Sequence, residues 1–370
     1  MQLELTPEQD QLRESVREVL DRECPTSVVR DLVERGAPAE ALWRRMVELG
    51  WPAICVPEEA GGLGLGFVEL AVVVEELGRH LAPPPYLATV TQFVPLIRAV
   101  GNPEQQARLL GAVVDGRTGA VAIAGDPARW DPAAPGMVAE RRGDAHRLHG
   151  TAYQVLDGAT ADEIAVVTQS AVFVVPRAQL TTKAADSVDA SRPYAAVTAD
   201  DVEVPADRVL RADRTAVAAA LEQATVALAL DVVGACQAAF DIALAYAKVR
   251  EQFGVPIGSF QALKHRFADL HISLERARAT AYFAALAIAE DDPRRALAAS
   301  MAKAAAGDCQ RLVGQDAIQL LGGIGYTWEH DIHLYAKRAK SGELLLGGAA
   351  WHRSRVADLI GLRRQERTKD

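Results

Sequence analysis

A glycine-rich stretch followed by a dense group of acidic and histidine residues stands near the end of the sequence. The run LLGGIGYTWEHDIH covers residues 320–333 and contains three glycines. Glycines at a helix end can form a cradle for phosphate groups, because they leave backbone N–H groups uncovered. Acidic and histidine side chains can bind a metal ion. The same stretch could also be a joint between two helices.

The acidic and histidine cluster consists of Glu329, His330, Asp331 and His333. His330 and His333 are three residues apart and could share one face of a helix, with a carboxylate beside them. Adjacent residues on a helix point about 100° apart, so the four side chains cannot converge on one ion. The run also lacks the HExxH spacing of metalloproteases. We therefore expect helix capping and hydrogen bonds between helices here, and no metal site.

A second stretch, REQFGVPIGSFQALKHRFAD over residues 250–269, lies between two helix-forming runs. Its Arg250 offers a guanidinium fork, which can bind the oxygens of a diphosphate with two hydrogen bonds. Gly322 and Gly323 carry no side chains, so a diphosphate could approach their backbone closely. Alternatively, Arg250 is a solvated cation at a helix end and the glycines are only a C-cap. Each motif taken alone leaves both interpretations open.

The pattern of apolar residues divides the chain into three segments. Residues 1–118 show helical periodicity interrupted by glycines and prolines. Residues 119–210 contain short β-branched runs separated by turn residues, which predicts the antiparallel strands of a small sheet domain or barrel. Residues 211–370 are alanine-rich and predict a helical bundle. This order predicts an α+β fold with separate layers, and the missing βαβ alternation and GxGxxG motif argue against a Rossmann domain.

The composition is ordinary for a soluble globular protein. The chain has 370 residues and a formal net charge of −9, and it shows no basic footprint for nucleic acid. Its four cysteines are far apart and form no CxxC pair, which is typical of buried free thiols in a reducing compartment. The N-terminal run lacks an apolar signal core, and no run of about 18 apolar residues is free of charge. We therefore expect a cytoplasmic protein without a membrane span.

Four stretches together resemble the acyl-CoA dehydrogenase family, whose members are flavoenzymes that desaturate acyl-CoA thioesters. They are the two stretches above, VPEEAGGLGLG at residues 56–66 and DDVEVPADRVL at residues 200–210. They stand in family order over essentially the whole chain. The resemblance implies an N-terminal helical domain (1–118), a middle β-barrel-like domain (119–210) and a C-terminal four-helix bundle (211–370) that contacts FAD and oligomerises.

The resemblance also assigns a role to the two motifs of the third segment. In the family, these groups reach into the flavin site of a neighbouring subunit, where the cation and the glycines meet the FAD diphosphate. With both motifs in family order, the interpretation as a helix-end cation and a C-cap becomes the weaker one. The positions that match the family's FAD-binding residues are Arg250, Phe253, Gln261, Gln319, Gly322 and Gly323.

The catalytic base that the family requires has no equivalent at the expected positions. Aligning AKSGELLLGG with the family's Tyr-Glu-Gly-Thr stretch places Leu346 where the glutamate belongs, and a leucine cannot take a proton. Some members carry the base on the long helix before the arginine motif, where this chain has Ala224. Glu222 lies about 200° around that helix, so we expect it to face elsewhere. Glu343 could serve only with a slipped alignment and is expected to be an exposed or capping carboxylate.

Other parts of the family's active site are also altered. The loop beside the flavin ring corresponds to AGDPARWDPA at residues 124–133, which lacks the family's Thr and Gly-Ser-Asp. A second flavin-side stretch corresponds to AYQVLDG at residues 152–158, without its Lys and Thr-Asn. Thr225 replaces the arginine that meets the CoA end. The altered residues all belong to one site, whereas those that complete a neighbour's flavin site are intact.

This asymmetry resembles the non-catalytic chain of heteromeric, two-chain acyl-CoA dehydrogenases of bacterial steroid degradation. The leading hypothesis is a subunit that completes the FAD site of a paralogous chain carrying the catalytic glutamate, with acyl-CoA bound in the partner's site. Electron-transfer flavoprotein is the electron acceptor that the family resemblance implies. The alternatives are a self-sufficient homotetrameric dehydrogenase with a relocated base, a non-catalytic scaffold of the same fold, and other flavin chemistry. The sequence does not identify the acyl group.

Overall fold

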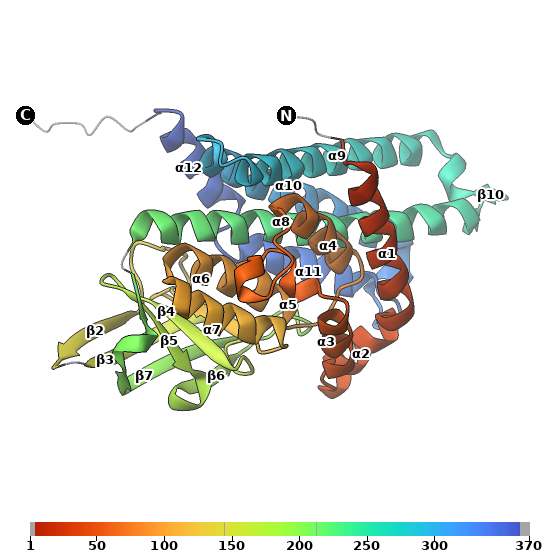
Figure 1. Cartoon of the computed structure of the whole chain (residues 1–370). Coiled ribbons are helices and arrows are strands. Elements are labelled where there is room, and N and C mark those ends of the chain that lie inside the picture. Colours follow the sequence, from red (N-terminus) through yellow and green to blue (C-terminus); the bar gives the residue numbers. More distant parts are fainter. Residues whose placement is uncertain (1–3, 144, 212, 363–370) are drawn as a thin grey trace, which may run out of the picture.

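The computed structural model describes residues 4–143, 145–211 and 213–362. Within this part of the chain, a helical region, a β-domain and a second helical region follow each other along the sequence (Figure 1). The order of helices, strands and helices predicted from the sequence is confirmed. The changes between regions fall between Val114 and Gly119 and between Leu210 and Arg214.

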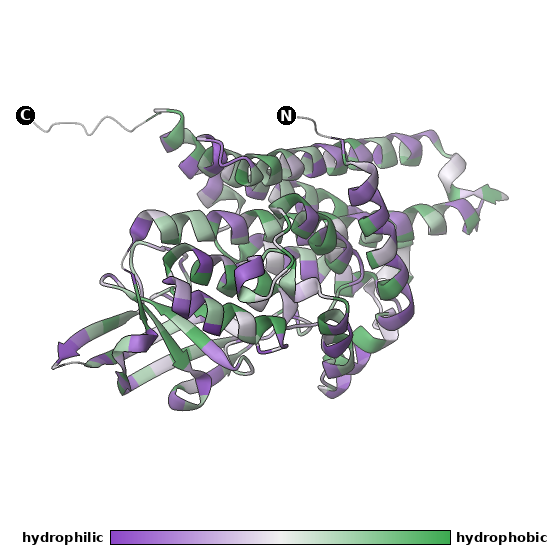
Figure 2. Ribbon diagram, viewed as in Figure 1, coloured by the Kyte–Doolittle hydropathy of each residue, from purple (hydrophilic) through white to green (hydrophobic). Residues whose placement is uncertain are grey.

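The N-terminal region consists of helices whose starts are encoded by local side chains. Thr6 and Gln9 form a capping box at the start of α1, and Asn102 and Gln105 form another at the start of α7. Helix α4 is largely buried and packs against α8 (Arg214–Val249) of the C-terminal region, and Figure 2 shows hydrophobic residues along both helices. The helices are α1 (Pro7–Glu23), α2 (Thr26–Arg35), α3 (Glu40–Glu48), α4 (Phe67–Arg79), α5 (Tyr86–Ala88), α6 (Val94–Val100) and α7 (Pro103–Val114).

The β-domain contains two four-stranded sheets, with strand orders β1-β4-β5-β8 and β2-β3-β7-β6. The prediction of antiparallel strands holds for every described pair of this domain except β1 and β4, which run parallel. The chain leaves the first sheet after β1, builds the β2–β3 hairpin of the second sheet and then returns, so β4 enters in the direction of β1. The strands are β1 (Gly119–Ala122), β2 (Met137–Arg142), β3 (Ala145–Leu156), β4 (Glu163–Val167), β5 (Val172–Pro176), β6 (Thr181–Ala185), β7 (Tyr194–Val204) and β8 (Val209–Leu210).

The C-terminal region is built around three long helices that pack on one another. Because α8, α9 and α10 run alternately up and down, α8 and α10 end on the same side of the bundle, beside the small β9–β10 hairpin (Figure 1). The elements are α8 (Arg214–Val249), β9 (Glu251–Gln252), β10 (Val255–Pro256), α9 (Gln261–Ala289), α10 (Arg295–Leu321), the 3-10 helix η7 (Gly322–Tyr326), α11 (Ile332–Leu344) and α12 (Ala349–Leu359).

Helix α8 is the central element of the molecule. By length and composition alone it could cross a membrane, although Glu222, Asp231 and Asp241 interrupt its apolar run, and 83% of its most apolar window is buried inside the protein. Its apolar surface therefore packs against protein on several sides, as expected for a helix that is hydrophobic almost all round.

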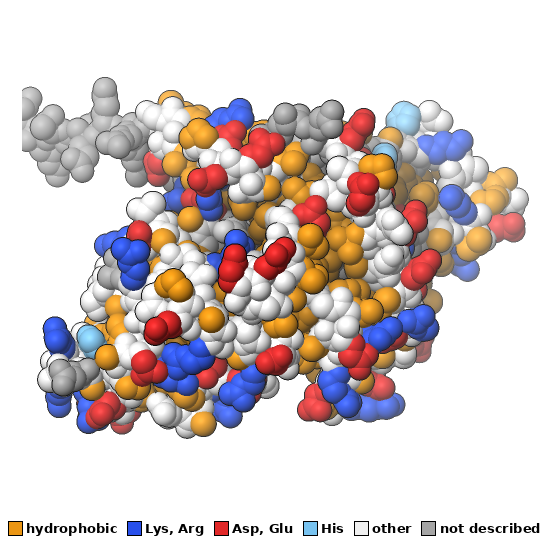
Figure 3. All heavy atoms as spheres, viewed as in Figure 1, with side chains coloured by type: hydrophobic (Ala, Val, Ile, Leu, Met, Phe, Trp, Pro, Cys, Tyr) orange, Lys and Arg blue, Asp and Glu red, His pale blue; other side chains and the backbone are white. Residues whose placement is uncertain are grey.

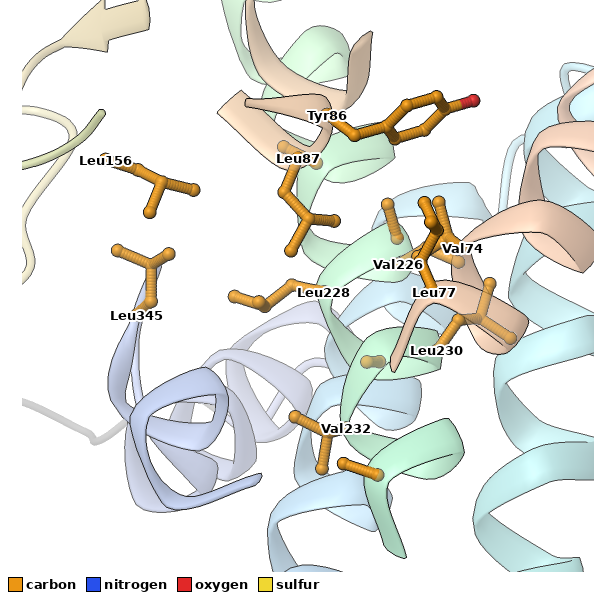
Figure 4. Packing of buried hydrophobic residues seen from close by; sticks show 14 of the residues in the cluster. Val74, Leu77, Tyr86, Leu87, Leu156, Val226, Leu228, Leu230, Val232 and Leu345 are labelled. Carbon is orange, nitrogen blue, oxygen red and sulfur yellow. The ribbon is translucent and has the colours of Figure 1, made fainter. Parts of the chain in front are cut away.

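A buried carboxylate joins all three regions. Asp231 of α8 accepts a hydrogen bond of 2.8 Å from Nη2 of Arg338 on α11, and its other oxygen binds Arg192, which precedes β7. The same Nη2 donates to the carbonyl of Ala82 in the N-terminal region at 3.2 Å. Apolar side chains of the three regions pack nearby: Figure 4 shows Leu345 and Leu156 facing each other, with Leu87 and Leu228 beside them.

The four cysteines are free and buried, as the sequence predicted. Burial raises the pKa of Cys24 and of Cys55 to about 12, so both thiols stay protonated at neutral pH. These residues contribute to packing.

Candidate functional site

A cavity of about 320 Å³ lies between the β-domain and the C-terminal helices. We call it the Leu346 cavity. Its wall is mostly apolar, with a few polar groups, which is the usual composition of a small-molecule site. Charged side chains at the wall are Arg211, Asp213, Arg214, Glu222 and Arg355.

Two positions that the family alignment places in one active site meet in this cavity. Leu346 and Thr225 both line it, although 121 positions separate them (346 − 225). The Thr225 hydroxyl donates to the carbonyl of Leu221 at 2.7 Å, so its polar group is already bonded within the helix. Ala224 is buried in the core and does not line the cavity. Neither expected base position therefore offers a proton acceptor to a ligand there.

Glu222 corrects the expectation that it would face elsewhere, because it lines the same cavity. It is three residues from Thr225, and residues at this spacing share one face of α8. Its Oε2 accepts a hydrogen bond of 2.9 Å from Nε of Arg295. Burial raises the pKa of this carboxyl, and Arg295 opposes the shift. If the direction of Glu222 around the helix had been measured from Thr225 and not from Ala224, the sequence would have predicted that Glu222 faces the cavity.

Glu343 lies outside the Leu346 cavity and acts as a helix cap. Its Oε1 accepts from the backbone N–H of Ala349 at 2.9 Å, at the start of α12, and its Oε2 accepts from Nζ of Lys340 at 2.9 Å. Burial raises the pKa of this carboxyl, but the hydrogen bonds from Ala349 and Lys340 outweigh burial and the pKa lies below its ordinary value. The side chain is buried, so of the two roles expected for it, exposed or capping, the structure gives capping.

Lys303 holds the turn beside the cavity, a structural role that the sequence did not signal. Its Nζ is buried and donates to the backbone carbonyls of Glu343 at 2.7 Å and Gly347 at 2.9 Å. These two bonds hold the turn that carries Leu346, whose φ of 57° lies in the left-handed region. Burial lowers the pKa of the Lys303 ammonium to about 7.

A second cavity of about 690 Å³ lies on the β-domain side of the same turn. We call it the Tyr153 groove. It brings together the two strand-domain stretches that the family places beside the flavin ring, because Pro127, Trp130, Tyr153 and Gln154 all line it. Nε2 of Gln154 donates to the carbonyl of Pro127 at 2.8 Å and joins the two stretches directly.

The six candidate FAD-binding residues lie at the other end of α8. Thr225 precedes Arg250 by 25 residues (250 − 225), which is about 37 Å of helix at 1.5 Å per residue. Arg250 is exposed, and its guanidinium makes no hydrogen bond or ion pair within the described chain. These residues therefore cannot serve the Leu346 cavity of their own chain. They are Arg250, Phe253, Gln261, Gln319, Gly322 and Gly323.

Their surroundings fit a ligand supplied by another molecule. Phe253 is 93% exposed at the tip that carries β9 and β10, where hydrophobic side chains reach the surface (Figure 3). Gly322 has a φ of 65°, and a Cβ on Gly322 or Gly323 would meet no atom of the described chain within 4 Å. On this side, the Arg266–Asp316 ion pair of 2.6 Å links the start of α9 to the end of α10. The Arg250 guanidinium and the backbone of Gly322 and Gly323 are thus each accessible, and the FAD assignment stays a prediction.

The acidic and histidine cluster makes structural contacts. Asp331 accepts from Nε of Arg30 on α2 at 2.6 Å, and the carbonyl of Trp328 accepts from the same guanidinium at 2.8 Å. Nδ1 of His330 accepts from the N–H of Ile332 at 3.1 Å. The His333 ring stacks edge-on against Trp328. Hydrogen bonding is therefore confirmed for Asp331 and His330, while Asp331, at the N-cap of α11, makes no side-chain capping bond within the described residues.

The family is shown by comparison with known proteins. The models "Acyl-CoA dehydrogenase, N-terminal domain" and "Acyl-CoA dehydrogenase, C-terminal domain" match residues 6–117 and 214–361. The chain belongs to the acyl-CoA dehydrogenase family, whose members bind FAD, and the predicted fold is confirmed.

Individual members of this family are similar to the chain over nearly its whole length. The chain is 32% identical to the acyl-CoA dehydrogenase IpdE2 of Mycobacterium tuberculosis, covering 92% of this chain and 94% of that protein. A solved Tcur3481-Tcur3483 steroid ACAD variant is 33% identical, with a TM-score of 0.87 and coverage of 95% and 97%. The ChsE4-ChsE5 complex from Mycobacterium tuberculosis is 28% identical, with a TM-score of 0.89 and coverage of 97% and 99%.

Proposed function

We propose that this chain is a subunit of a heteromeric, FAD-dependent acyl-CoA dehydrogenase and completes the flavin site of a paralogous partner. One observation carries the proposal. Leu346, which cannot accept a proton, lines the chain's own cavity. Arg250 lies exposed about 37 Å along α8 from Thr225 of that cavity, and Gly322 and Gly323 lie exposed after the end of α10. The chain thus exposes groups that could bind a ligand of another subunit, and it has no proton acceptor at either expected base position.

The chemistry of desaturation explains why this division matters. A proton leaves the carbon next to the thioester carbonyl, and a hydride leaves the following carbon. When bound, FAD accepts the hydride. A carboxylate must take the proton, and neither Leu346 nor the buried Ala224 can do so. In the partner's site, Arg250 would bind the FAD diphosphate with two hydrogen bonds, while Gly322 and Gly323 let the diphosphate reach the backbone.

The proposed partners follow from this role. A paralogous chain would supply the catalytic glutamate and hold the acyl-CoA, and electron-transfer flavoprotein would take the electrons in the cytoplasm. Two solved relatives, one a steroid ACAD and the other the ChsE4-ChsE5 complex, support a bulky steroid-type thioester and a heteromer. The net charge of −9 gives no support for nucleic acid as a partner.

Co-expression tests the proposal. The chain is purified alone and together with a paralogue that carries the glutamate, and flavin absorption and acyl-CoA oxidation are measured for both. We expect flavin and turnover in the complex and neither in the chain alone. Full flavin occupancy with turnover by the chain alone would contradict the proposal. A colourless, inactive complex would favour the non-catalytic scaffold.

A second candidate function is a self-sufficient dehydrogenase with a relocated base, and Glu222 is the observation that favours it. Glu222 shares the cavity with Leu346, and burial raises its pKa, as a general base requires. If this function holds, Glu222→Gln abolishes turnover of the chain alone and leaves flavin bound. Glu343→Gln is the matched control, because that carboxylate caps α12 outside the cavity. In the heteromer, Glu222→Gln leaves turnover unchanged.

A further inference from the structure

The Leu346 cavity and the Tyr153 groove are separate cavities that share a wall. Among the described residues, Trp130 and Trp351 line both. Trp130 comes from the loop that replaces the family's flavin-side segment, and Trp351 lies in the first turn of α12. Two large aromatic side chains from different regions therefore lie on the wall that the two cavities share.

The backbone turn after Leu346 forms the third part of this wall. A Cβ built on Gly347 would lie 2.9 Å from Cε3 of Trp351 and 3.1 Å from Cδ1 of Trp130, so both indoles press against this glycine. The φ of Gly347 is 94°, which only glycine adopts easily. The Lys303 ammonium holds the Gly347 carbonyl at 2.9 Å. This hydrogen bond helps to fix the conformation of the turn.

Trp351 is held in place from its own helix as well. The next residue, His352, is buried, and its Nε2 bonds the carbonyl of Leu346 at 3.1 Å. Arg355, one turn further along α12, lies 5.8 Å above the Trp351 ring. The position of this indole relative to Leu346 is therefore fixed by contacts on both sides.

We propose that Trp130 and Trp351 form a partition that keeps a ligand in the Leu346 cavity out of contact with a flavin in the Tyr153 groove. The inference rests on the proposed function, in which the acyl-CoA that reacts is bound in the partner's site. In this chain, the motif alignment makes the cavity with Leu346 and Thr225 the acyl side and the groove with Tyr153 the flavin side. Hydride transfer requires reacting atoms about 3–3.5 Å apart, and close-packed side chains in between prevent that approach. The chain's own site is then silent for a reason independent of the missing base.

The partition sets the length of the acyl group that the cavity accepts, which gives a test without flavin. The purified chain is titrated calorimetrically with saturated acyl-CoA thioesters of increasing length. In the wild type, affinity rises by about fourfold per methylene until the cavity is full, and then stops rising. In Trp130→Ala the limit moves to longer chains, because the groove of about 690 Å³ joins the cavity. Trp351→Ala, on another element, is the second variant if the first does not fold.

Trp328→Ala is the matched control, since this tryptophan is 63% exposed and lines neither cavity. We expect its length limit to equal that of the wild type. The same limit in the wild type and in both partition variants would overturn the inference, as would a wild type that binds no thioester of any length. A colourless heteromer would contradict the proposed function alone, because this measurement needs no flavin.

Discussion

At the scale of single residues, Lys303 determines the geometry around Leu346. Burying an ammonium group costs free energy, and two backbone carbonyls offset part of this cost because they accept hydrogen bonds from Lys303. The charged groups that influence it are Glu343, which favours the ammonium, and Arg192 and Lys340, which oppose it. Burial outweighs them, so the ammonium gives up its proton far more easily than an exposed lysine.

This shift predicts a pH dependence of stability. The pKa of Lys303 falls from an ordinary 10.5 to about 7 on folding, so the unfolded chain binds more protons between these pH values. The contribution of Lys303 to the free energy of unfolding therefore rises from about pH 7 to about pH 10.5. We therefore measure the free energy of unfolding of the wild type and of Lys303→Met by urea unfolding across this pH range. We expect the free energy of the wild type to increase relative to that of the variant as the pH rises. A constant difference would contradict the shift.

At the scale of elements, α8 carries two functional regions that cannot act on one ligand. Glu222 and Thr225 line a cavity near its start, and Arg250 follows its last residue. A straight helix fixes the distance between these regions, because its rise per residue is constant. The helix thus places one region toward the chain's own β-domain and the other toward the outside.

The Arg250 end predicts a specific loss of cofactor affinity in the heteromer. Arg250→Lys keeps the charge but loses the fork that makes two parallel hydrogen bonds, so the dissociation constant for FAD should rise about tenfold or more. FAD titration of the flavin-free heteromer measures it. Arg44→Lys, on the exposed surface of α3, is the control and should leave affinity unchanged. Unchanged affinity in Arg250→Lys would favour the interpretation of Arg250 as a helix-end cation.

At the scale of the whole molecule, Asp231 makes the three regions one cooperative unit. Its carboxylate binds two buried guanidiniums, from the loop before β7 and from α11, and one of these also reaches the N-terminal region. Removing one partner of such a pair leaves an uncompensated buried charge, which is far more costly than losing a surface pair.

We expect Asp231→Asn to lower the free energy of unfolding by about 3–5 kcal/mol. Asp241→Asn is the control on the same helix. Its ion pair with Arg79 is partly exposed, so we expect a loss of at most about 1 kcal/mol. Guanidinium unfolding followed by circular dichroism compares the two variants. Equal losses in the two variants would show that the ion pairs of Asp231 contribute no more to stability than the partly exposed pair of Asp241.

The sequence predicted the fold well, because family motifs and apolar periodicity cover nearly the whole chain. The shared location of Leu346 and Thr225 was also accessible from the motif alignment. The placement of Glu222 was missed, since the rotation of α8 relative to the cavity depends on packing and not on residue counting. Lys303 and the parallel β1–β4 pair were missed because both depend on contacts between distant segments.

The length of α8 has a consequence for how the chain can change over time. Substitutions farther apart than about 10 Å have nearly additive effects, and its two functional ends are about 37 Å apart. Mutations near Leu346 can therefore accumulate without disturbing the Arg250 end. A duplicated gene copy could lose its own chemistry stepwise while still being selected for the groups it contributes to its sibling.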